Sequence, residues 1–325
     1  MKNDVSVIIP NWNGKHLLEK YLPSVFESIY EASVSSEVIV IDDGSTDDSI
    51  KFLQENYPNI HLIRNNTNRG FAITCNKGIE CAKYRWVLLL NNDVSLTKDY
   101  IKILLSNGDV DNLFSVSGKI LEMGTEKIID GGKLGEFRGG NYRVTRNYMV
   151  EDLNSTRQTY YTFYNPATCC LYDRDKLLAL NGFDEMFSPF YWEDTDIAYR
   201  AWKRGWISIF EPHANAYHVP GTTIGLVIRK KQIYIVSRRN KFFFHWKNLT
   251  DISLIFQHTV SLLLVAVFRW LLLDFKFYVA LFSALRKYPE VRKKRKVEIK
   301  YRKLTDTDVM KYIDTGISGL KTSFF

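Results

Sequence analysis

Cysteine is scarce in this sequence, with only Cys75, Cys81, Cys169 and Cys170 among 325 residues. None forms a C-x-x-C pair, and the two adjacent cysteines are poorly placed to bridge each other. The sequence therefore predicts neither a disulfide framework nor a cysteine zinc site, and a reducing compartment fits it best. It is not a low-complexity chain either, because 46% of its residues are hydrophobic and 25% are charged, the balance of a globular protein.

The glycine-rich motifs that hold nucleotide phosphates are also missing. The chain has no G-x-x-x-x-G-K-[ST] run, and no G-x-G-x-x-G run follows its first predicted strand. P-loop hydrolysis and ordinary dinucleotide binding therefore lose their main support. There is no nucleophile elbow, which disfavours a covalent hydrolase. A nucleotide, if bound, has to be held by carboxylates and a metal ion instead.

Negative charge is rare in residues 229–303, which contain 19 Lys/Arg and 4 Asp/Glu, whereas the rest of the chain contains 25 Lys/Arg and 32 Asp/Glu. This basic region includes an uncharged run of seventeen residues, 252–268, and a second apolar run, 275–285. A membrane span needs about 20 apolar residues, so the first run is borderline. Apolar helices with basic flanks favour peripheral or monotopic binding to the anionic cytoplasmic face of a membrane.

The basic region is also compatible with two different roles. The apolar runs could form a buried helical hairpin, or a dimer interface in a homo-oligomer. A basic patch with interleaved aromatic residues could also bind RNA, but the sequence contains no zinc finger, RNP signature or other nucleic-acid motif. We therefore expect no nucleic-acid partner.

The first hundred residues alternate predicted strands with predicted helices. Strands are expected at 5–10, 37–41, 60–64 and 86–90, and helices at 15–32, from Ser45 onward, and at 70–83. This alternation predicts a parallel sheet that helices cover on both faces. The middle of the chain is less regular, since the glycine-rich residues 128–142 predict hairpins and loop and residues 141–159 a polar connection.

Polar clusters follow three of the predicted strands, at residues 11–13, 42–43 and 91–93. The carboxyl ends of parallel strands meet at one edge of a sheet, where ligands bind in such folds. Asp93 could hold a divalent cation that bridges to a diphosphate, or could form an Asx turn. Asp43 could likewise bind a nucleoside or belong to a turn, and Trp12 could stack on a base or pack in the core.

Three acidic residues, Glu193, Asp194 and Asp196, begin a helix predicted at 192–204. Acids in a first turn complement the helix dipole. Three within four residues exceed what that needs, so a carboxylate here could serve as a general base. His218, on a predicted strand, is either a core histidine or, beside a metal, a ligand.

Six segments in order resemble the family 2 glycosyltransferases of the GT-A fold. They are VSVIIPNWNG (5–14), VIVIDDGSTDDS (38–49), NRGFAITCNKG (68–78), VLLLNNDV (87–94), GFDEMFSPFYWEDTDIAYRAWKRGW (182–206) and AYHVPG (216–221). The resemblance implies an α/β, Rossmann-like fold with a mixed, mainly parallel central sheet and flanking helices. The catalytic domain would cover 1–228, with a nucleotide-sugar half at about 1–95 and an acceptor half at about 96–228. A helical membrane-associating region, 229–303, and a tail, 304–325, would follow.

The resemblance also implies roles for the residues that bind the donor. Pro10, Trp12 and Asp43 would line the nucleoside pocket with Asp42 near it, and Arg69 and Gly70 would lie beside the base and ribose. Residues 91–93 occupy the position of the family's DXD motif. Asn92 would contact the donor.

At the same motif, the resemblance implies that Asp93 ligates Mn2+ or Mg2+, together with Asn91. His218 would join the metal or the diphosphate. Many relatives carry Asp where this sequence has Asn91, but position 93 is the one most needed. Asp194 matches the catalytic base, and Glu193 beside it would shape the acceptor site.

The expected activity is therefore metal-dependent, inverting transfer of a sugar from a UDP- or dTDP-sugar to a hydroxyl of a lipid-linked or glycan acceptor, in the synthesis of a cell-surface polysaccharide or glycan. The motifs are most similar to those of rhamnosyl- and galactofuranosyl-transferases. A non-catalytic sugar-nucleotide or glycan-binding module is the alternative, although such a module need not keep an acid at position 194. A nucleotidyltransferase would need a glycine- and basic-rich loop, which residues 11–14 do not provide.

Overall fold

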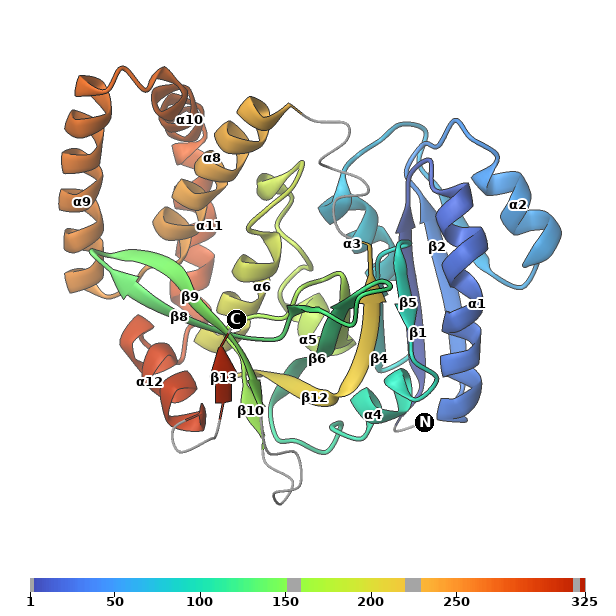
Figure 1. Cartoon of the computed structure of the whole chain (residues 1–325). Coiled ribbons are helices and arrows are strands. Elements are labelled where there is room, and N and C mark those ends of the chain that lie inside the picture. Colours follow the sequence, from blue (N-terminus) through green and yellow to red (C-terminus); the bar gives the residue numbers. More distant parts are fainter. Residues whose placement is uncertain (1–2, 151–158, 220–228, 318–321, 325) are drawn as a thin grey trace.

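The computed structural model describes residues 3–150, 159–219, 229–317 and 322–324 (Figure 1). Its centre is a ten-stranded sheet with the order β10-β12-β6-β11-β4-β1-β2-β3, in which β5 also pairs with β12 and β7 with β6. The four strands β1 (Val5–Asn11), β2 (Ser36–Asp42), β3 (His61–Arg64) and β4 (Trp86–Leu90) run parallel. The predicted parallel sheet is therefore confirmed in the N-terminal part of the chain.

The other half of the sheet is mixed. β11 (Cys169–Asp173) runs antiparallel to β4 and to β6 (Leu113–Glu122), while β12 (Ile207–His218) runs parallel to β6. The short strands are β5 (Val94–Leu96), β7 (Ile128–Asp130) and β10 (Tyr160–Tyr161). Both faces of the sheet are covered, by α1 (Lys15–Ala32), α2 (Ser49–Asn56), α3 (Phe71–Cys81), α4 (Tyr100–Leu105), α5 (Arg174–Ala179), the 3-10 helix η1 (Glu185–Phe187) and α6 (Glu193–Lys203).

Alternation along the central strands explains why helices cover two faces. Leu88 and Leu90 of β4 belong to one buried cluster, whereas Val87 and Leu89 point into another. Successive side chains of a strand point to opposite faces, so a strand that is apolar throughout needs a cover on each side. All four cysteines are free, as the sequence predicted.

One helix begins later than predicted. We expected it from Ser45, but α2 begins at Ser49. The hydroxyl of Ser45 instead accepts a hydrogen bond from the backbone N–H of Asn13 at 2.8 Å, and its own N–H donates to Asp42 at 3.0 Å. Ser45 is therefore part of the turn that joins the ends of two neighbouring strands.

The polar connection predicted at 141–159 is wrong for its first ten residues. These form β9 (Asn141–Val150), which pairs with β8 (Gly132–Arg138) and β13 (Thr322–Phe324). Two glycines of β8 make room for tyrosine side chains of β9. A Cβ at Gly132 would lie 2.2 Å from the ring of Tyr148, and a Cβ at Gly135 would lie 2.2 Å from the hydroxyl of Tyr142. Each ring fills the space that a glycine leaves open, so the pair of strands is well packed. Residues 151–158 lie outside the described part of the chain.

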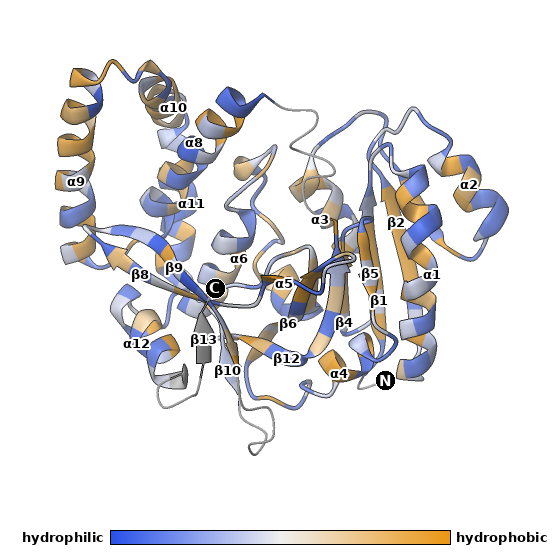
Figure 2. Ribbon diagram, viewed as in Figure 1, coloured by the Kyte–Doolittle hydropathy of each residue, from blue (hydrophilic) through white to orange (hydrophobic). Residues whose placement is uncertain are grey.

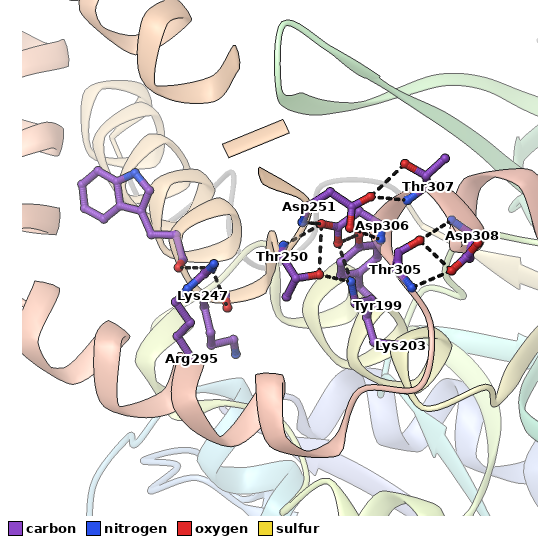
Figure 3. Close-up of polar contacts among 11 residues, drawn as sticks. Tyr199, Lys203, Lys247, Thr250, Asp251, Arg295, Thr305, Asp306, Thr307 and Asp308 are labelled. Carbon is purple, nitrogen blue, oxygen red and sulfur yellow. Dashed lines mark hydrogen bonds and ion pairs between the residues drawn. The ribbon is translucent and has the colours of Figure 1, made fainter. Parts of the chain in front are cut away.

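The C-terminal region is helical, with α8 (Lys230–Asn248), α9 (Ile252–Leu271), α10 (Phe275–Arg286), α11 (Tyr288–Tyr301) and α12 (Asp306–Ile317). Buried ion pairs attach it to the sheet domain. The ammonium of Lys247 lies 2.6 Å from a carboxylate oxygen of Asp184 and 2.7 Å from one of Asp196. Asp306 accepts hydrogen bonds from Tyr199 at 2.5 Å and from Lys203 at 2.7 Å (Figure 3). The boundary predicted after residue 228 borders residues 220–228, which are outside the described ranges.

The first two helices after α8 expose their apolar side chains. Within the described residues, Ile252–Leu271 is the one helix long and apolar enough to cross a membrane, and 6% of that window is buried. His258 is the single buried residue of α9. Leu264 and Leu271 are 67% and 73% exposed, and much of the ribbon of this helix is orange in Figure 2, the colour of hydrophobic residues. The described residues therefore do not bury α9 as part of a helical hairpin.

Candidate active site

A cavity of about 430 Å³ opens at the carboxyl ends of β1, β2 and β4. It brings together most of the predicted site residues, namely Pro10, Trp12, Asp43, Gly70, Asn91, Asn92, Asp93, Glu193 and Asp194. Three predicted residues, Asp42, Arg69 and His218, lie next to this set without lining the cavity. Asp93 and Asp194 therefore share one open cavity, although about 100 residues separate them in the sequence.

Hydrogen bonds between amide and carboxylate side chains connect the ends of the strands. Asn92 Nδ2 donates to Asn11 Oδ1 at 2.7 Å, and Asn11 Nδ2 donates to Asp42 Oδ1 at 3.1 Å. Asp42 thus lies outside the cavity and helps to hold the side chains of Asn11 and Asn92, which line it. Gly14 permits this arrangement, because a Cβ there would lie 2.2 Å from Asn92 Nδ2 and 2.4 Å from Asn11 Oδ1.

Asp43 fixes the loop that forms one wall. Its Oδ1 accepts hydrogen bonds from Asn65 Nδ2 at 2.8 Å and from the backbone N–H of Arg69 at 2.9 Å, and its Oδ2 accepts one from the N–H of Gly70 at 2.9 Å. Gly70 has φ +86°, a left-handed conformation that glycine adopts without strain. Arg69 therefore helps to hold this loop through its backbone N–H, while Gly70 lines the cavity.

Asp93 and His218 meet because β5 pairs with the end of β12, where Val94 lies opposite His218. The distance from His218 Nε2 to Asp93 Oδ2 is 3.3 Å, and Asp93 is 4% exposed. Within the described ranges no group of three or more His, Cys, Asp or Glu side chains converges on one point. Carboxylate oxygen suits Mn2+ and Mg2+, which complete their shells with water and phosphate oxygens, whereas an imidazole nitrogen is accepted more readily by the transition metal Mn2+ than by Mg2+. The donor set fits such a cation, and residues 220–221 of the matching segment lie outside the described chain.

The turn before α6 aims two acids into the cavity. Trp192 and Tyr191 have φ of +79° and +71°, which is uncommon for large side chains and marks a constrained turn. Burial raises the pKa of Asp194 to about 7, and Asp130 adds to the increase. Burial and the neighbouring Asp194 raise the pKa of Glu193 to about 8. Asp194 Oδ1 and Glu193 Oε2 are buried without a hydrogen-bond donor in the described chain.

The third acid of the group has a different role. Asp196 is fully buried, and its Oδ2 lies 2.7 Å from Arg200 Nε. Its Oδ1 lies 2.7 Å from the ammonium of Lys247 and accepts a hydrogen bond from Asn248. These partners hold α6 against α8, so Asp196 is structural, whereas Asp194 has the environment of a proton acceptor with a raised pKa.

Helix α8 supports the same turn from outside. Asn240 Nδ2 donates to the carbonyl oxygens of Phe190 and Tyr191, both at 2.9 Å, and Arg239 donates to the carbonyl of Ser188 at 2.5 Å. No sequence pattern indicates this contact, because about fifty residues separate its partners. Further lining residues that we did not predict are Asn68, Phe71, Thr74, Thr168 and Pro189. Asn68, Phe71 and Thr74 fall in the quoted segment 68–78 and Pro189 in the segment 182–206, and these two segments were the available hints.

Residues 6–179 match the family model described as glycosyl transferase family 2. The chain belongs to this family. Among curated proteins it is 26% identical over 228 residues to the N-acetylglucosaminyl-diphospho-decaprenol L-rhamnosyltransferase of Mycobacterium tuberculosis, covering 63% of this chain and 72% of that protein. The predicted glycosyltransferase family is thereby confirmed.

Solved structures agree on the fold. A crystal structure of GalNAc-T7 with UDP, GalNAc and Mn2+ has a TM-score of 0.61 at 18% identity, over 77% of this chain and 48% of that one. S. aureus TarS 1-349 in complex with UDP has a TM-score of 0.54 at 18% identity, over 78% and 68%. The predicted GT-A architecture is confirmed, with a mixed, mainly parallel central sheet and flanking helices.

Proposed function

We propose that this family 2 glycosyltransferase transfers a sugar from a UDP- or dTDP-sugar to a hydroxyl of a lipid-linked or glycan acceptor, with inversion at the anomeric carbon. The observation that supports the proposal most is the shared cavity of Asp93 and Asp194. One acid lies beside a histidine that suits a diphosphate-bound cation, and the second has the raised pKa of a base.

On the donor side, Trp12, Pro10 and Gly70 would hold the nucleoside, and Asp93, His218 and Asn91 would hold Mn2+ or Mg2+. When bound, the cation neutralises negative charge on the departing diphosphate. Asn92 is held by Asn11, so its side chain is fixed before the donor arrives. Preorganised polar groups of this kind need no rearrangement during the reaction.

On the acceptor side, Asp194 accepts the proton of the attacking hydroxyl. The hydroxyl oxygen forms the new bond to the anomeric carbon, while the bond to the diphosphate breaks and the diphosphate leaves with its electron pair. Attack opposite the leaving group inverts the configuration in one step, and no covalent enzyme intermediate is needed. Glu193, beside the base, orients the acceptor.

We also assign the exposed face of α9 and α10 to an anionic membrane surface on the cytoplasmic side, bound peripherally or monotopically. The exposed side chains of Leu264, Leu271 and Phe275 support this, as does the basic charge of 229–303. The Mycobacterium tuberculosis relative is named for a decaprenol-linked substrate, which agrees with a membrane-bound acceptor. Cell-surface polysaccharide or glycan synthesis follows as the biological setting.

A donor screen tests the proposal. Release of the nucleoside diphosphate from UDP- and dTDP-sugars is measured with Mn2+, with and without candidate acceptors. We expect release that depends on the acceptor, together with a product of inverted configuration. Donor binding without any turnover would favour the non-catalytic binding module, and a product of retained configuration would refute the single displacement.

A further inference from the structure

Three cations lie close to the turn before α6, namely Lys241 and Arg238 of α8 and Arg143 of β9. None of them forms an ion pair with a carboxylate of the described residues. Glu136 is the cross-strand neighbour of Arg143, but the two side chains form no ion pair. By contrast, the buried cation Lys247 of the same helix is paired with two aspartates.

The cluster lies beside the acids of α6. The ammonium of Lys241 sits 5.7 Å from the centre of the Trp192 ring, and Trp192 directly precedes Glu193 and Asp194. The Trp192 ring also packs against Phe244 of α8, so Lys241 lies where α8 contacts the turn before α6.

The environment of Lys241 is unfavourable for a cation alone. Burial and the positive charges of Arg238 and Arg143 together lower the pKa of Lys241 to about 8. Lys241 and Arg238 are partly buried, whereas Arg143 is exposed, and like charges held close together repel one another unless an anion offsets them. An arrangement of this kind is typical of an anion-binding site.

The same cluster borders the apolar helices. The β8–β9 hairpin touches α9 at Gly140, where a Cβ would lie 2.2 Å from the backbone N of His258, and Asn141 Nδ2 donates to Ser261 Oγ at 3.2 Å. Arg143 follows two residues later on β9. Helix α8, which carries Lys241 and Arg238, lies between the exposed apolar helix α9 and helix α6 with its acids (Figure 1).

A second contact connects the far end of the cluster to these helices. Arg238 lies over the ring of Tyr234, with 5.5 Å between the guanidinium carbon and the ring centre. Tyr234 Oη donates to Asp274 at 3.3 Å, and Asp274 caps the start of α10.

We propose that Lys241, Arg238 and Arg143 bind the phosphate groups of the acceptor, a lipid whose hydrocarbon chain is joined through phosphate to the acceptor sugar. The chain lies along the exposed face of α9 and α10, and the sugar hydroxyl reaches Asp194. This assignment rests on the proposed function. The diphosphate of the donor is a less suitable occupant, because the residues that suit it, Asp93 and His218, lie at the donor cavity, which none of the three cations lines.

Binding to vesicles tests the site without catalysis. The full chain is floated with phosphatidylcholine vesicles that contain undecaprenyl diphosphate, undecaprenol or phosphatidylglycerol. We expect the diphosphate to bind more tightly than the alcohol. The double variant Lys241→Gln/Arg143→Gln should weaken diphosphate binding about tenfold, because it removes two charge-assisted hydrogen bonds.

The matched control is Lys293→Gln/Lys296→Gln, which removes two exposed charges from α11 in the same basic region. This control should bind the diphosphate like wild type. The variant Lys241→Gln/Arg143→Lys, which keeps a positive charge at position 143, should bind it more tightly than Lys241→Gln/Arg143→Gln. Both double variants are first checked for a melting temperature that is no lower than that of wild type. Equal loss in the two double variants, or wild-type affinity in Lys241→Gln/Arg143→Gln, would overturn the assignment.

Two further arms identify the source of the phosphate. If the cluster variant loses phosphatidylglycerol binding as strongly as diphosphate binding, the site binds membrane headgroups and the acceptor assignment is wrong. If excess UDP displaces undecaprenyl diphosphate, the cluster belongs to the donor and the assignment is also wrong. Asp194→Asn should keep undecaprenyl diphosphate binding while losing transfer. Failure of the catalytic proposal therefore remains distinguishable from failure of this one.

Discussion

Replacing Asp194 by Asn tests the base in two independent ways. The change preserves shape but removes the proton acceptor, and general acid–base catalysis contributes about 10²- to 10⁴-fold to a rate. We therefore expect kcat to fall by that range, which is about 3–5 kcal/mol of activation free energy. Because wild-type Asp194 has a pKa of about 7, its rate should rise with pH and reach a plateau above 7. At about pH 6 it should be about a tenth of the plateau.

The same substitution should stabilise the fold at high pH. The folded-state pKa of Asp194 is raised above its ordinary value of 3.8, so the unfolded chain loses its proton first and the folded state is penalised as pH rises from about 4 to 7. The penalty above about pH 7 is at most about 4 kcal/mol. Asn carries no such penalty, and the variant should melt at a higher temperature than wild type at about pH 8 and at a similar one at about pH 4.

Acceptor-dependent nucleotide release and thermal unfolding, both followed from about pH 5 to 9, give the two readouts. Glu193→Gln is the comparison variant, because it alters the adjacent acid and leaves the base. It should raise the KM for the acceptor more than it lowers kcat. Normal turnover by Asp194→Asn, with a wild-type pH profile, would refute the assignment of the base.

Four more changes probe the rest of the site. Gly14→Ala places a methyl group against Asn92 and Asn11, and should lower the unfolding free energy by about 1–3 kcal/mol in denaturant titration; an unchanged midpoint would contradict the close approach. Asp93→Ala should abolish the gain in UDP affinity that Mn2+ produces, and a retained gain in calorimetry would remove Asp93 from the metal site. Asn240→Ala leaves the carbonyls of the 187–191 turn without their donor and should cost about 1–3 kcal/mol in thermal unfolding while raising the acceptor KM; an unaltered KM would argue against a positioning role. Replacing Leu264 and Leu271 by Ser should reduce flotation with anionic vesicles at low salt, whereas equal flotation of both proteins would disprove membrane binding through α9.

Local patterns predicted the part of the fold that contains the donor site. The strand at 86–90 is apolar at every position, and the cluster at 91–93 follows it directly, so both the strand and its polar end could be located without coordinates. The pairing of Gly132 and Gly135 with tyrosine rings could not be located in this way, because it depends on the register between two strands. The glycines alone predict a loop.

The separate roles of the three acids also required the structure. Glu193, Asp194 and Asp196 are equivalent as a sequence pattern. Only the structure shows that Asp196 is paired with two buried cations, Arg200 and Lys247, whereas Asp194 lines the cavity. Lys247 lies about fifty residues away in a helix that we assigned to the membrane region. The sequence therefore could not predict that α8 supports the turn before α6.

The cation at Asp93 and the base at Asp194 are expected to act in one cavity, and the proposed reaction depends on this. A crystal structure of the full chain with Mn2+ and UDP tests it most directly. We predict that the ion is coordinated by Asp93 and His218, that the nucleoside lies against Trp12, and that the free diphosphate end faces Asp194. An ion remote from Asp93, or a nucleotide bound outside this cavity, would contradict the proposed reaction.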